Sequence, residues 1–218
     1  LDNLYIFKNT EGTPENIRKF HPNIIVSSTG SAPLLPPIAG LKDRIDNENH
    51  NIYSILGMIS HINDFPKDLE GKKVVVVGGG AVGLDVVEFF ADRNADISIV
   101  EMMDQIGRDL DPVSKNDTKT MMKKHNVHQL TKTALLEVKD SSFLVRGDGE
   151  PYELPFEYGF VCLGMRAQGQ LYQNLTEEFS SEDVEIMNIG DSQRARRIID
   201  GTQEGRNILT ILEQRGYL

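Results

Sequence analysis

The sequence predicts an α/β fold in which a parallel β-sheet is followed by an antiparallel β-meander. Two observations carry this prediction. From residue 72 the chain reads as a strand, a glycine-rich turn, a helix and a second strand, which is the order of a parallel βαβ unit. Further on, several short apolar runs surround the tight-turn signal Gly147-Asp148-Gly149, as the strands of a meander do.

The part before residue 72 contains short elements and a proline-rich stretch. Residues 4–7 read as a strand, and residues 24–26 as a short buried strand. Thr13 and Pro14 are typical of a helix N-cap and first helical position, so we expect a short helix through residue 20. The prolines between residues 33 and 40 exclude regular helix and central strand. We therefore expect a linker and a first domain boundary there.

Regular elements dominate from residue 73 onward. The apolar pattern predicts two helices in the central part and a third near the end of the chain, with short strands between them. The predicted helices cover residues 81–94, about 112–125 and 200–215. The predicted strands cover residues 73–77, 97–101, 127–131, 134–138, 143–146, 159–163 and 184–189.

The run KKVVVVGGGAVG over residues 72–83 is the most informative part of the sequence. Four consecutive valines suit a strand that is buried on both faces. Gly78, Gly80 and Gly83 follow with the G-x-G-x-x-G spacing of a dinucleotide-binding turn. The first glycine permits the sharp bend, the second lets the main chain approach a pyrophosphate, and the third lets the helix pack on the sheet. The amides of Ala81 and Val82 would then face the anion.

An acidic residue ends the next predicted strand. Glu101 lies 18 residues after Gly83 (101 − 83), close to the spacing of about 20 expected for an acid that binds the adenosine ribose. A carboxylate there accepts hydrogen bonds from the ribose hydroxyls and repels a 2′-phosphate, so we expect NAD(H) rather than NADP(H). Arg108 is the nearby group that would favour the opposite choice. The alternatives are a plain βα turn for the glycines and a solvated strand-end acid for Glu101.

The composition excludes several classes of function. The 218 residues carry 23 Lys and Arg against 33 Asp and Glu, which gives a formal net charge of −10. A chain this acidic is a poor general binder of nucleic acid or anionic membrane, and neither is expected as a partner. No apolar run approaches the about 18 residues of a membrane span, and nothing resembles a signal peptide. We expect a protein of the reduced cytoplasm.

Cysteine and histidine offer no metal site. Cys162 is the single cysteine, so an internal disulfide, dithiol chemistry and a Cys-ligated metal are excluded within this chain. It sits in an apolar run, which indicates a buried, inert thiol. The five histidines are scattered and lack a metal-binding spacing. No metal ligand is therefore predicted.

Three stretches stand in an order typical of flavoproteins with two dinucleotide-binding folds. They are STGSAP at residues 28–33, the glycine unit from Gly78 to Glu101, and Gly190-Asp191. The chain resembles the C-terminal half of NADH:flavin oxidoreductases of the old-yellow-enzyme, 2,4-dienoyl-CoA reductase and enoate reductase type, within the pyridine nucleotide-disulfide oxidoreductase superfamily. The likeness continues in PPI at residues 36–38, VEM at 100–102, IGRD at 106–109 and LGMR at 163–166.

This resemblance implies a Rossmann-like NAD(P)-binding domain with a β-meander, inserted in an FAD-binding domain whose N-terminal part is missing. Residues 1–42 and 167–218 would be the two parts of the FAD-binding domain. Residues 43–70 would be a linker, and residues 71–166 the NAD(P)-binding domain. We expect an excised fragment that is inactive alone and does not retain FAD, because half of the FAD phosphate-binding turn would precede Leu1.

The resemblance also implies an electron relay. NADH passes hydride to FAD, and electrons then reach FMN in an upstream TIM barrel through an iron–sulfur cluster, so that FMN reduces an activated C=C bond. FMN, the cluster and the barrel would lie outside this chain. The expected partners are therefore NADH, FAD and an upstream FMN-barrel region of the same polypeptide. We name no catalytic residue, because hydride transfer between cofactors needs no side chain as acid or base.

The resemblance assigns cofactor contacts in both domains. The pyrophosphate loop matches Gly78, Gly80, Ala81, Val82 and Gly83, the ribose acid matches Glu101, and the glycine after the last NAD-domain strand matches Gly164. Residues near the FAD adenylate match Thr29 and Gly30, and the acid on the FAD ribityl chain matches Asp191.

The sequence departs from the family pattern at three positions. Asp85 stands where a glutamate usually lies near the nicotinamide amide, Ala167 follows Arg166 where Pro-Asn is usual, and Ser28 replaces an alanine. Two other functions stay open, the first because of the departures at Asp85 and Ala167 and the second because the upstream sequence would decide it. One is a structural module that holds ADP or NAD without turnover. The other is a stand-alone FAD-dependent electron-transfer reductase.

Overall fold

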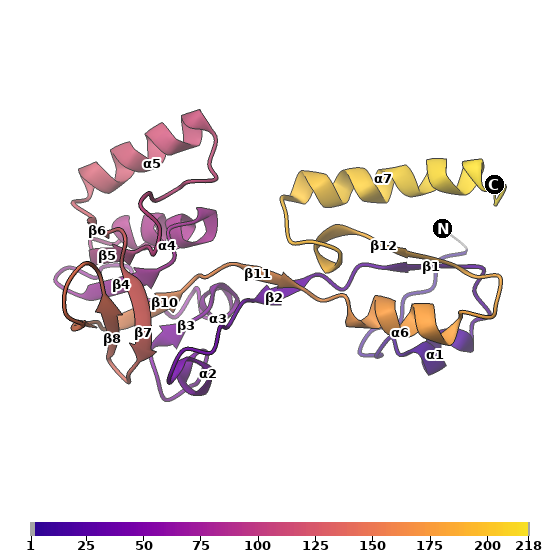
Figure 1. Cartoon of the computed structure of the whole chain (residues 1–218), viewed down its shortest axis with the longest axis horizontal. Coiled ribbons are helices and arrows are strands. Elements are labelled where there is room, and N and C mark those ends of the chain that lie inside the picture. Colours follow the sequence, from indigo (N-terminus) through magenta and orange to yellow (C-terminus); the bar gives the residue numbers. More distant parts are fainter. Residues whose placement is uncertain (1–2, 218) are drawn as a thin grey trace. The chain divides into compact units, whose positions relative to one another are not determined.

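The chain folds into two compact units. The structure is a computed structural model that describes residues 3–217 (Figure 1). Unit 1 combines the residues up to Ala32 with those from Met165 onward, and unit 2 is the continuous stretch Pro33–Gly164. Unit 2 is thus inserted within the sequence of unit 1. This order agrees with the predicted insertion of one domain into another.

A five-stranded parallel sheet forms the centre of unit 2. Its strands stand in the order β3-β10-β4-β5-β6, and each neighbouring pair is parallel. The strands are β3 (Ile52–Tyr53), β10 (Tyr158–Val161), β4 (Lys73–Val77), β5 (Asp96–Val100) and β6 (His128–Leu130). The chain runs from β4 outward to β5 and β6 on one side, and it returns to β10 on the other side. The sheet therefore changes direction of winding at β4.

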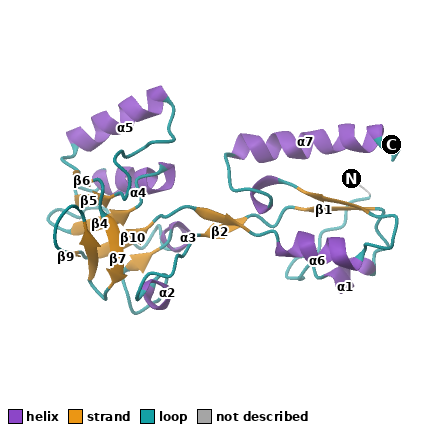
Figure 2. Cartoon of the chain, in the orientation of Figure 1, coloured by secondary structure: helices purple, strands orange, loops and turns teal. Residues whose placement is uncertain are grey.

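Helices and a small antiparallel sheet complete unit 2. The helices are α2 (Leu41–Arg44), α3 (Ile55–Ser60), α4 (Ala81–Ala91) and α5 (Pro112–Lys124). The second sheet is the predicted meander, with β7 (Ala134–Val138), β8 (Ser142–Arg146) and β9 (Tyr152–Pro155) in sequential order. Figure 2 shows helix α4 and the strands of the meander against the parallel sheet.

The four valines of β4 divide the core of unit 2 into two layers. Side chains alternate between the faces of a strand. Val74 and Val76 therefore pack with Phe90 of α4 in one apolar cluster. Val75 and Val77 pack with Phe143 and other side chains of the meander in a second cluster. Helix α4 covers one face of the sheet and the meander covers the other.

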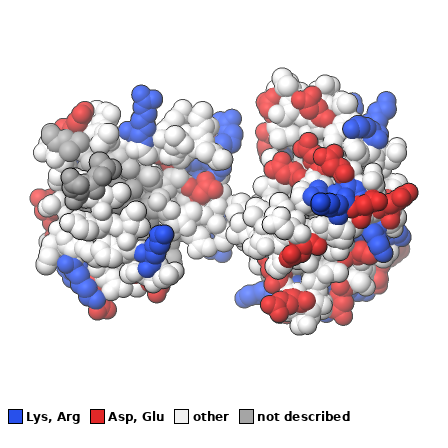
Figure 3. Space-filling model, turned by 180° about the vertical axis from the view of Figure 1, so that it is seen from behind, with Lys and Arg blue, Asp and Glu red and all other residues white. Residues whose placement is uncertain are grey.

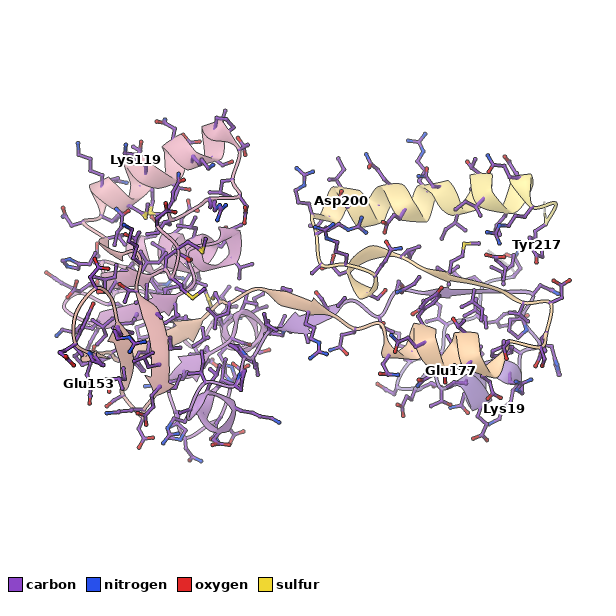
Figure 4. The ribbon with its side chains drawn as sticks, in the orientation of Figure 1. Lys19, Lys119, Glu153, Glu177, Asp200 and Tyr217 are labelled. Atoms are coloured by element: carbon purple, nitrogen blue, oxygen red, sulfur yellow. The ribbon has the colours of Figure 1, made fainter. Side chains whose placement is uncertain are left out.

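Polar residues set the ends of the helices of unit 2. Asp111 is the N-cap of α5, and its Oδ1 accepts hydrogen bonds from the N–H groups of Val113 and Ser114 at 3.0 and 3.2 Å. Asn94 and Asn126 follow α4 and α5 with φ of 61° and 51°. Asparagine tolerates this left-handed conformation and so ends a helix well. Figure 4 shows Lys119 on the outer side of α5.

Unit 1 is built on two parallel strands, β1 (Ile24–Ser27) and β12 (Glu185–Asn188). Its small core consists of Ile25, Leu175 and Phe179. A short ribbon pairs β2 (Ser31–Pro33) with β11 (Met165–Ala167), where the chain passes between the units. The other elements are α1 (Pro14–Arg18), α6 (Gln170–Glu178), the short 3-10 helix η1 (Gly190–Ser192) and α7 (Ile198–Gln214).

Most predicted elements are present, with ends that differ by a few residues. Strands β4 and β7 have the predicted bounds, and Thr13 caps α1 as expected. The strand predicted over residues 4–7 is wrong, because this stretch forms no regular structure and its Tyr5 side chain is 77% exposed. An apolar run needs a neighbouring strand for its backbone groups. None of the described strands pairs with it.

The stretch 43–70 also differs from the predicted linker. It contains part of α2, then β3 and α3, and β3 pairs with β10 at the edge of the parallel sheet. Met58, Phe65 and Leu69 from this stretch are buried in the cluster that contains α4. By its contacts it belongs to unit 2, whose boundary falls at Ala32 and Pro33.

The surface carries mixed charge. On the face of Figure 3, acidic and basic side chains alternate on each unit, without an extended basic surface. Among the described residues, no helix combines the length and the apolar character needed to cross a membrane.

Candidate functional site

A cleft of about 800 Å³ lies in unit 2 at the carboxyl ends of three neighbouring strands. Val77 ends β4 in its centre, Val100 ends β5 on one side, and Cys162 follows β10 on the other. Ligands of open α/β sheets bind where the winding changes direction, outside the carboxyl ends of the strands. The cleft occupies this position.

Gly78 and Gly80 line the cleft, Gly83 lies behind them in the first turn of α4, and each of the three predicted glycines has a distinct geometric role. Gly78 has a φ of +110°, and a Cβ there would lie 2.1 Å from the carbonyl oxygen of Cys162. A Cβ on Gly83 would lie 1.9 Å from the carbonyl oxygen of Gly78. Gly80 differs, because a Cβ there would meet no atom within 4 Å. The first and third glycines are thus required by packing, and the second keeps the cleft open.

Helix α4 begins in the cleft with free backbone donors. Gly80 is its N-cap and supplies no side-chain hydrogen bond. Ala81 and Val82, in the first turn, line the cleft. The N–H groups of a first helical turn lack partners within the helix, and the helix dipole favours an anion beside them. This end of α4 suits a phosphate group.

Glu101 is fixed beside the glycine turn by two backbone groups. Its Oε2 accepts a hydrogen bond from the N–H of Gly79 at 2.7 Å, and its Oε1 accepts one from the N–H of Met103 at 2.7 Å. The side chain is half-buried and lines the cleft. A carboxylate has about four acceptor positions. Glu101 therefore retains acceptor capacity for two hydroxyl groups.

Gly79 is a site residue that the sequence analysis missed. A Cβ there would lie 3.0 Å from Oε2 of Glu101 and 3.1 Å from Cγ1 of Ile106. The G-x-G-x-x-G pattern leaves this position open. The signal for its role was the run of three consecutive glycines, because the pattern requires only the first and the last of them.

The opposite side of the cleft is formed by the residues after β10. Gly164 has a φ of +103° and lines the cleft together with Cys162. Cys162 is 8% exposed, and its burial, followed by the charge of Asp85, raises the pKa of the thiol to about 12. The expectation of a buried thiol is confirmed.

Asp85 and Arg108 differ in their relation to the cleft, because Arg108 lines it and Asp85 does not. Asp85 projects from an exposed position of α4 and is not among the described residues that line the cleft. Partial loss of water around its carboxyl group raises its pKa. Arg108 does line the cleft, and it belongs to the loop that follows Glu101.

The predicted residues of unit 1 gather around the turn after β12. The Oδ2 of Asp191 accepts a hydrogen bond from the Ser31 hydroxyl at 3.1 Å, and its Oδ1 accepts one from the N–H of Arg196 at 3.1 Å. The Thr29 hydroxyl donates to the carbonyl of Gln168 at 2.5 Å. Gly30 has a φ of +75° and open space at its Cβ position. The structure thus joins the start of β2, through Ser31, to the turn that carries Asp191.

The sheet order, the glycine turn and the strand-end acid define a dinucleotide-binding fold of the Rossmann type. The sequence profile of the pyridine nucleotide-disulphide oxidoreductase family matches residues 6–187, and the chain belongs to this family. Its members are oxidoreductases that bind FAD and NAD(P)H. The resemblance noted in the sequence is confirmed at this level.

Two characterised proteins and one solved structure illustrate the likeness. An NADH oxidase of Thermoanaerobacter brockii is 26% identical over 192 residues, which cover 88% of this chain and 28% of that protein. A metal reductase of Desulforamulus reducens is 26% identical over 234 residues, covering 91% and 32%. The structure of a 2-naphthoyl-CoA reductase with 2-naphthoyl-CoA superposes with a TM-score of 0.73 at 22% identity, covering 90% and 28%. The chain spans about a third or less of the length of these proteins.

Proposed function

We propose that this chain is the NADH-accepting, flavin-reducing module of a larger flavin oxidoreductase. Unit 2 would bind NADH, and unit 1 would supply part of an FAD site. The observation that carries the proposal is the cleft of unit 2, where the free amides of α4, the open space at Gly80 and the carboxylate of Glu101 meet. When bound, the nicotinamide supplies a hydride to the flavin.

The residues of the cleft fit a dinucleotide. Gly80 leaves room for the main chain to contact a pyrophosphate, and the amides of Ala81 and Val82 would donate to it. Glu101 would accept hydrogen bonds from the adenosine ribose. Cys162 and Gly164, on the other side of the turn, would border the nicotinamide half. The neutral thiol of Cys162 would add apolar surface rather than chemistry.

We propose NAD(H) rather than NADP(H) as the dinucleotide. The carboxylate of Glu101 would repel a 2′-phosphate, and its two backbone hydrogen bonds hold it in the cleft. Arg108 also lines the cleft and is the group that favours a 2′-phosphate, but it is exposed and has no such anchor among the described contacts. The contact proposed for Asp85 with the nicotinamide amide receives no support from the lining of the cleft.

The FAD contacts proposed for unit 1 are Thr29, Gly30 and Asp191. Asp191 is oriented by Ser31 and by the N–H of Arg196, which suits a carboxylate that must hold a ligand hydroxyl. Gly30 and Gly190 leave open space where a side chain would stand. The remaining FAD contacts would come from a preceding segment, so we propose that this chain alone neither retains FAD nor turns over.

The complete protein would pass electrons from FAD to FMN in an upstream barrel, which would reduce an activated C=C bond. Support comes from the likeness to a 2-naphthoyl-CoA reductase and to a larger NADH oxidase and metal reductase that this chain covers in part. Asp85 and Ala167, which depart from the family pattern, favour a second candidate: a module that binds ADP or NAD without turnover. We propose the cytoplasm as the location of either.

Rapid mixing of the full-length protein with NADH tests the proposal. We expect the visible absorbance of the flavin to fall as the flavin is reduced. If NADH binds and the flavin stays oxidised, the non-catalytic module is correct. Calorimetry of this chain with NADH and with ADP-ribose tests the binding step separately, and absence of binding to both would refute the role of unit 2.

A further inference from the structure

We propose that Gly79, Glu101 and the loop of residues 102–110 form a clip that determines which dinucleotide the cleft accepts. This inference rests on the proposed function and deepens it. Glu101 would act as the ligand of the ribose and also as the tether of the glycine turn. Gly79 would be a specificity-determining residue, because a Cβ there would lie only 3.0 Å from Oε2 of Glu101 and would press on the tethered carboxylate.

Both polar groups of Gly79 are engaged by the same loop. Its N–H donates to Oε2 of Glu101 at 2.7 Å, and its carbonyl oxygen accepts from the N–H of Gly107 at 2.7 Å. Oε1 of Glu101 in turn accepts from the N–H of Met103 at 2.7 Å. The middle residue of the glycine turn is therefore held from both sides by residues that follow β5.

The clip is anchored to the sheet and the meander. The N–H of Glu101 donates to the carbonyl of Leu130 at 2.9 Å, and its carbonyl oxygen accepts from the N–H of Thr133 at 2.9 Å. The carbonyl oxygen of Met103 accepts from the N–H of Lys132 at 2.8 Å. The backbone on either side of the Glu101 side chain is thus fixed before any ligand arrives, which limits the ways in which its carboxylate can turn.

The clip also determines how the cleft accommodates the 2′-phosphate of NADPH. A free strand-end carboxylate can swing toward water when a 2′-phosphate approaches. The carboxylate of Glu101 would lose two charge-assisted hydrogen bonds if it did so. Arg108, on the same loop and in the lining of the cleft, could then pair with the phosphate. Displacement of Glu101 should therefore weaken NADH binding and strengthen NADPH binding relative to it.

Substitutions at position 79 test this mechanism in the full chain. A side chain at position 79 would press on Oε2 of Glu101 and Cγ1 of Ile106. For Gly79→Val we expect the Kd of NADH to rise by about tenfold or more, the equivalent of one charge-assisted hydrogen bond, and the Kd of NADPH to rise less. Gly79→Ala should shift the ratio of the two constants in the same direction by less. Gly149→Ala, where a Cβ meets no atom within 4 Å, is the matched control and should leave both unchanged.

Hydrogen exchange of the ligand-free chain gives a readout that does not depend on binding. We expect faster exchange of the Met103 and Gly107 amides in the Gly79 variants. If these variants do not fold, Glu101→Gln replaces them, because its amide nitrogen faces one backbone N–H and breaks one of the two hydrogen bonds. The clip would be overturned if the ratio of the Kd values for NADH and NADPH stayed unchanged and the Met103 amide exchanged at the wild-type rate. If the wild-type chain binds neither nucleotide, the proposed function fails, and the exchange rates alone decide whether the clip exists.

Discussion

The carbonyl oxygen of Gly78 lies 1.9 Å from the place that a Cβ atom would take on Gly83. The first turn of α4 therefore packs directly on the bend that leaves β4. Because this contact joins backbone to backbone, no side-chain rotation can relieve it. The contact also fixes the distance between the helix start and the strand end, and hence the width of the space above Gly80.

The change Gly83→Ala should therefore destabilise the chain. The added methyl group would force α4 away from β4, and overpacking of this kind costs about 1–3 kcal/mol. Thermal unfolding followed by circular dichroism measures the effect. The matched control is Gly205→Ala in α7, where a Cβ meets no atom within 4 Å and the helix should gain a little stability. Equal stability of the two variants would contradict the close packing of Gly83.

The change Gly80→Ala should separate binding from folding. Gly80 has φ of −79° and ψ of −179°, which alanine adopts without strain, and its Cβ would enter open space. We expect the unfolding free energy to stay within about 1 kcal/mol of wild type, since only the helix N-cap is affected. The methyl group would occupy the approach to the phosphate, so the Kd of NADH should rise by about tenfold or more. Calorimetry on the folded wild type and variant measures the Kd of NADH. An unchanged Kd would show that the nucleotide does not bind at this turn.

The thiol of Cys162 should ionise at a higher pH in the folded chain than in the unfolded chain. Burial, then the charge of Asp85, raises the pKa of the folded thiol to about 12, against an ordinary value of 9.0. The unfolded thiol ionises first, so this group's contribution to stability is present below about pH 9 and is lost as the pH rises toward 12. Alkylation of Cys162 in the native chain should be limited by unfolding. In Cys162→Ala this part of the loss of stability at alkaline pH should vanish. Fast alkylation of the native thiol would contradict its burial.

Asp111 should give α5 a dependence on acid. The hydroxyl and N–H of Ser114, together with the N–H of Val113, lower the pKa of Asp111 below its ordinary value of 3.8. A lowered pKa means that the stabilisation is present above that value and is lost as the pH falls through the pKa of the folded state. Unfolding of wild type and Asp111→Asn over a pH series measures it. The variant keeps a capping oxygen without the charge, so its stability should vary less with acid; parallel curves would contradict this.

Local patterns were enough to predict β4, α4 and the glycine turn. Four consecutive valines, an apolar helix face and glycines at fixed spacing all act over a few residues, and all are present in unit 2. The spacing also placed Glu101 at the cleft. It did not reveal that the carboxylate binds the N–H groups of Gly79 and Met103, because these contacts depend on how the loop after β5 returns to the turn.

Elements that depend on distant partners were harder to predict. Strand β3 has two residues and exists because β10, more than 100 residues later in the chain, pairs with it. Residues 4–7 have a stronger strand pattern but meet no strand among the described residues. Short apolar runs become strands only where a neighbour accepts their backbone hydrogen bonds, and the sequence of the run does not contain that information.

The entry and exit of unit 2 are adjacent. The N–H of Leu34 donates to the carbonyl oxygen of Gly164 at 2.9 Å, so the two ends of the stretch Pro33–Gly164 are joined by one hydrogen bond. A domain with such neighbouring ends behaves as a cassette. Because its two ends are neighbours, it can be removed or replaced by a homologous domain with another coenzyme preference, and the rest of the chain can be rejoined at one point. Its own ends can also be linked by a short loop.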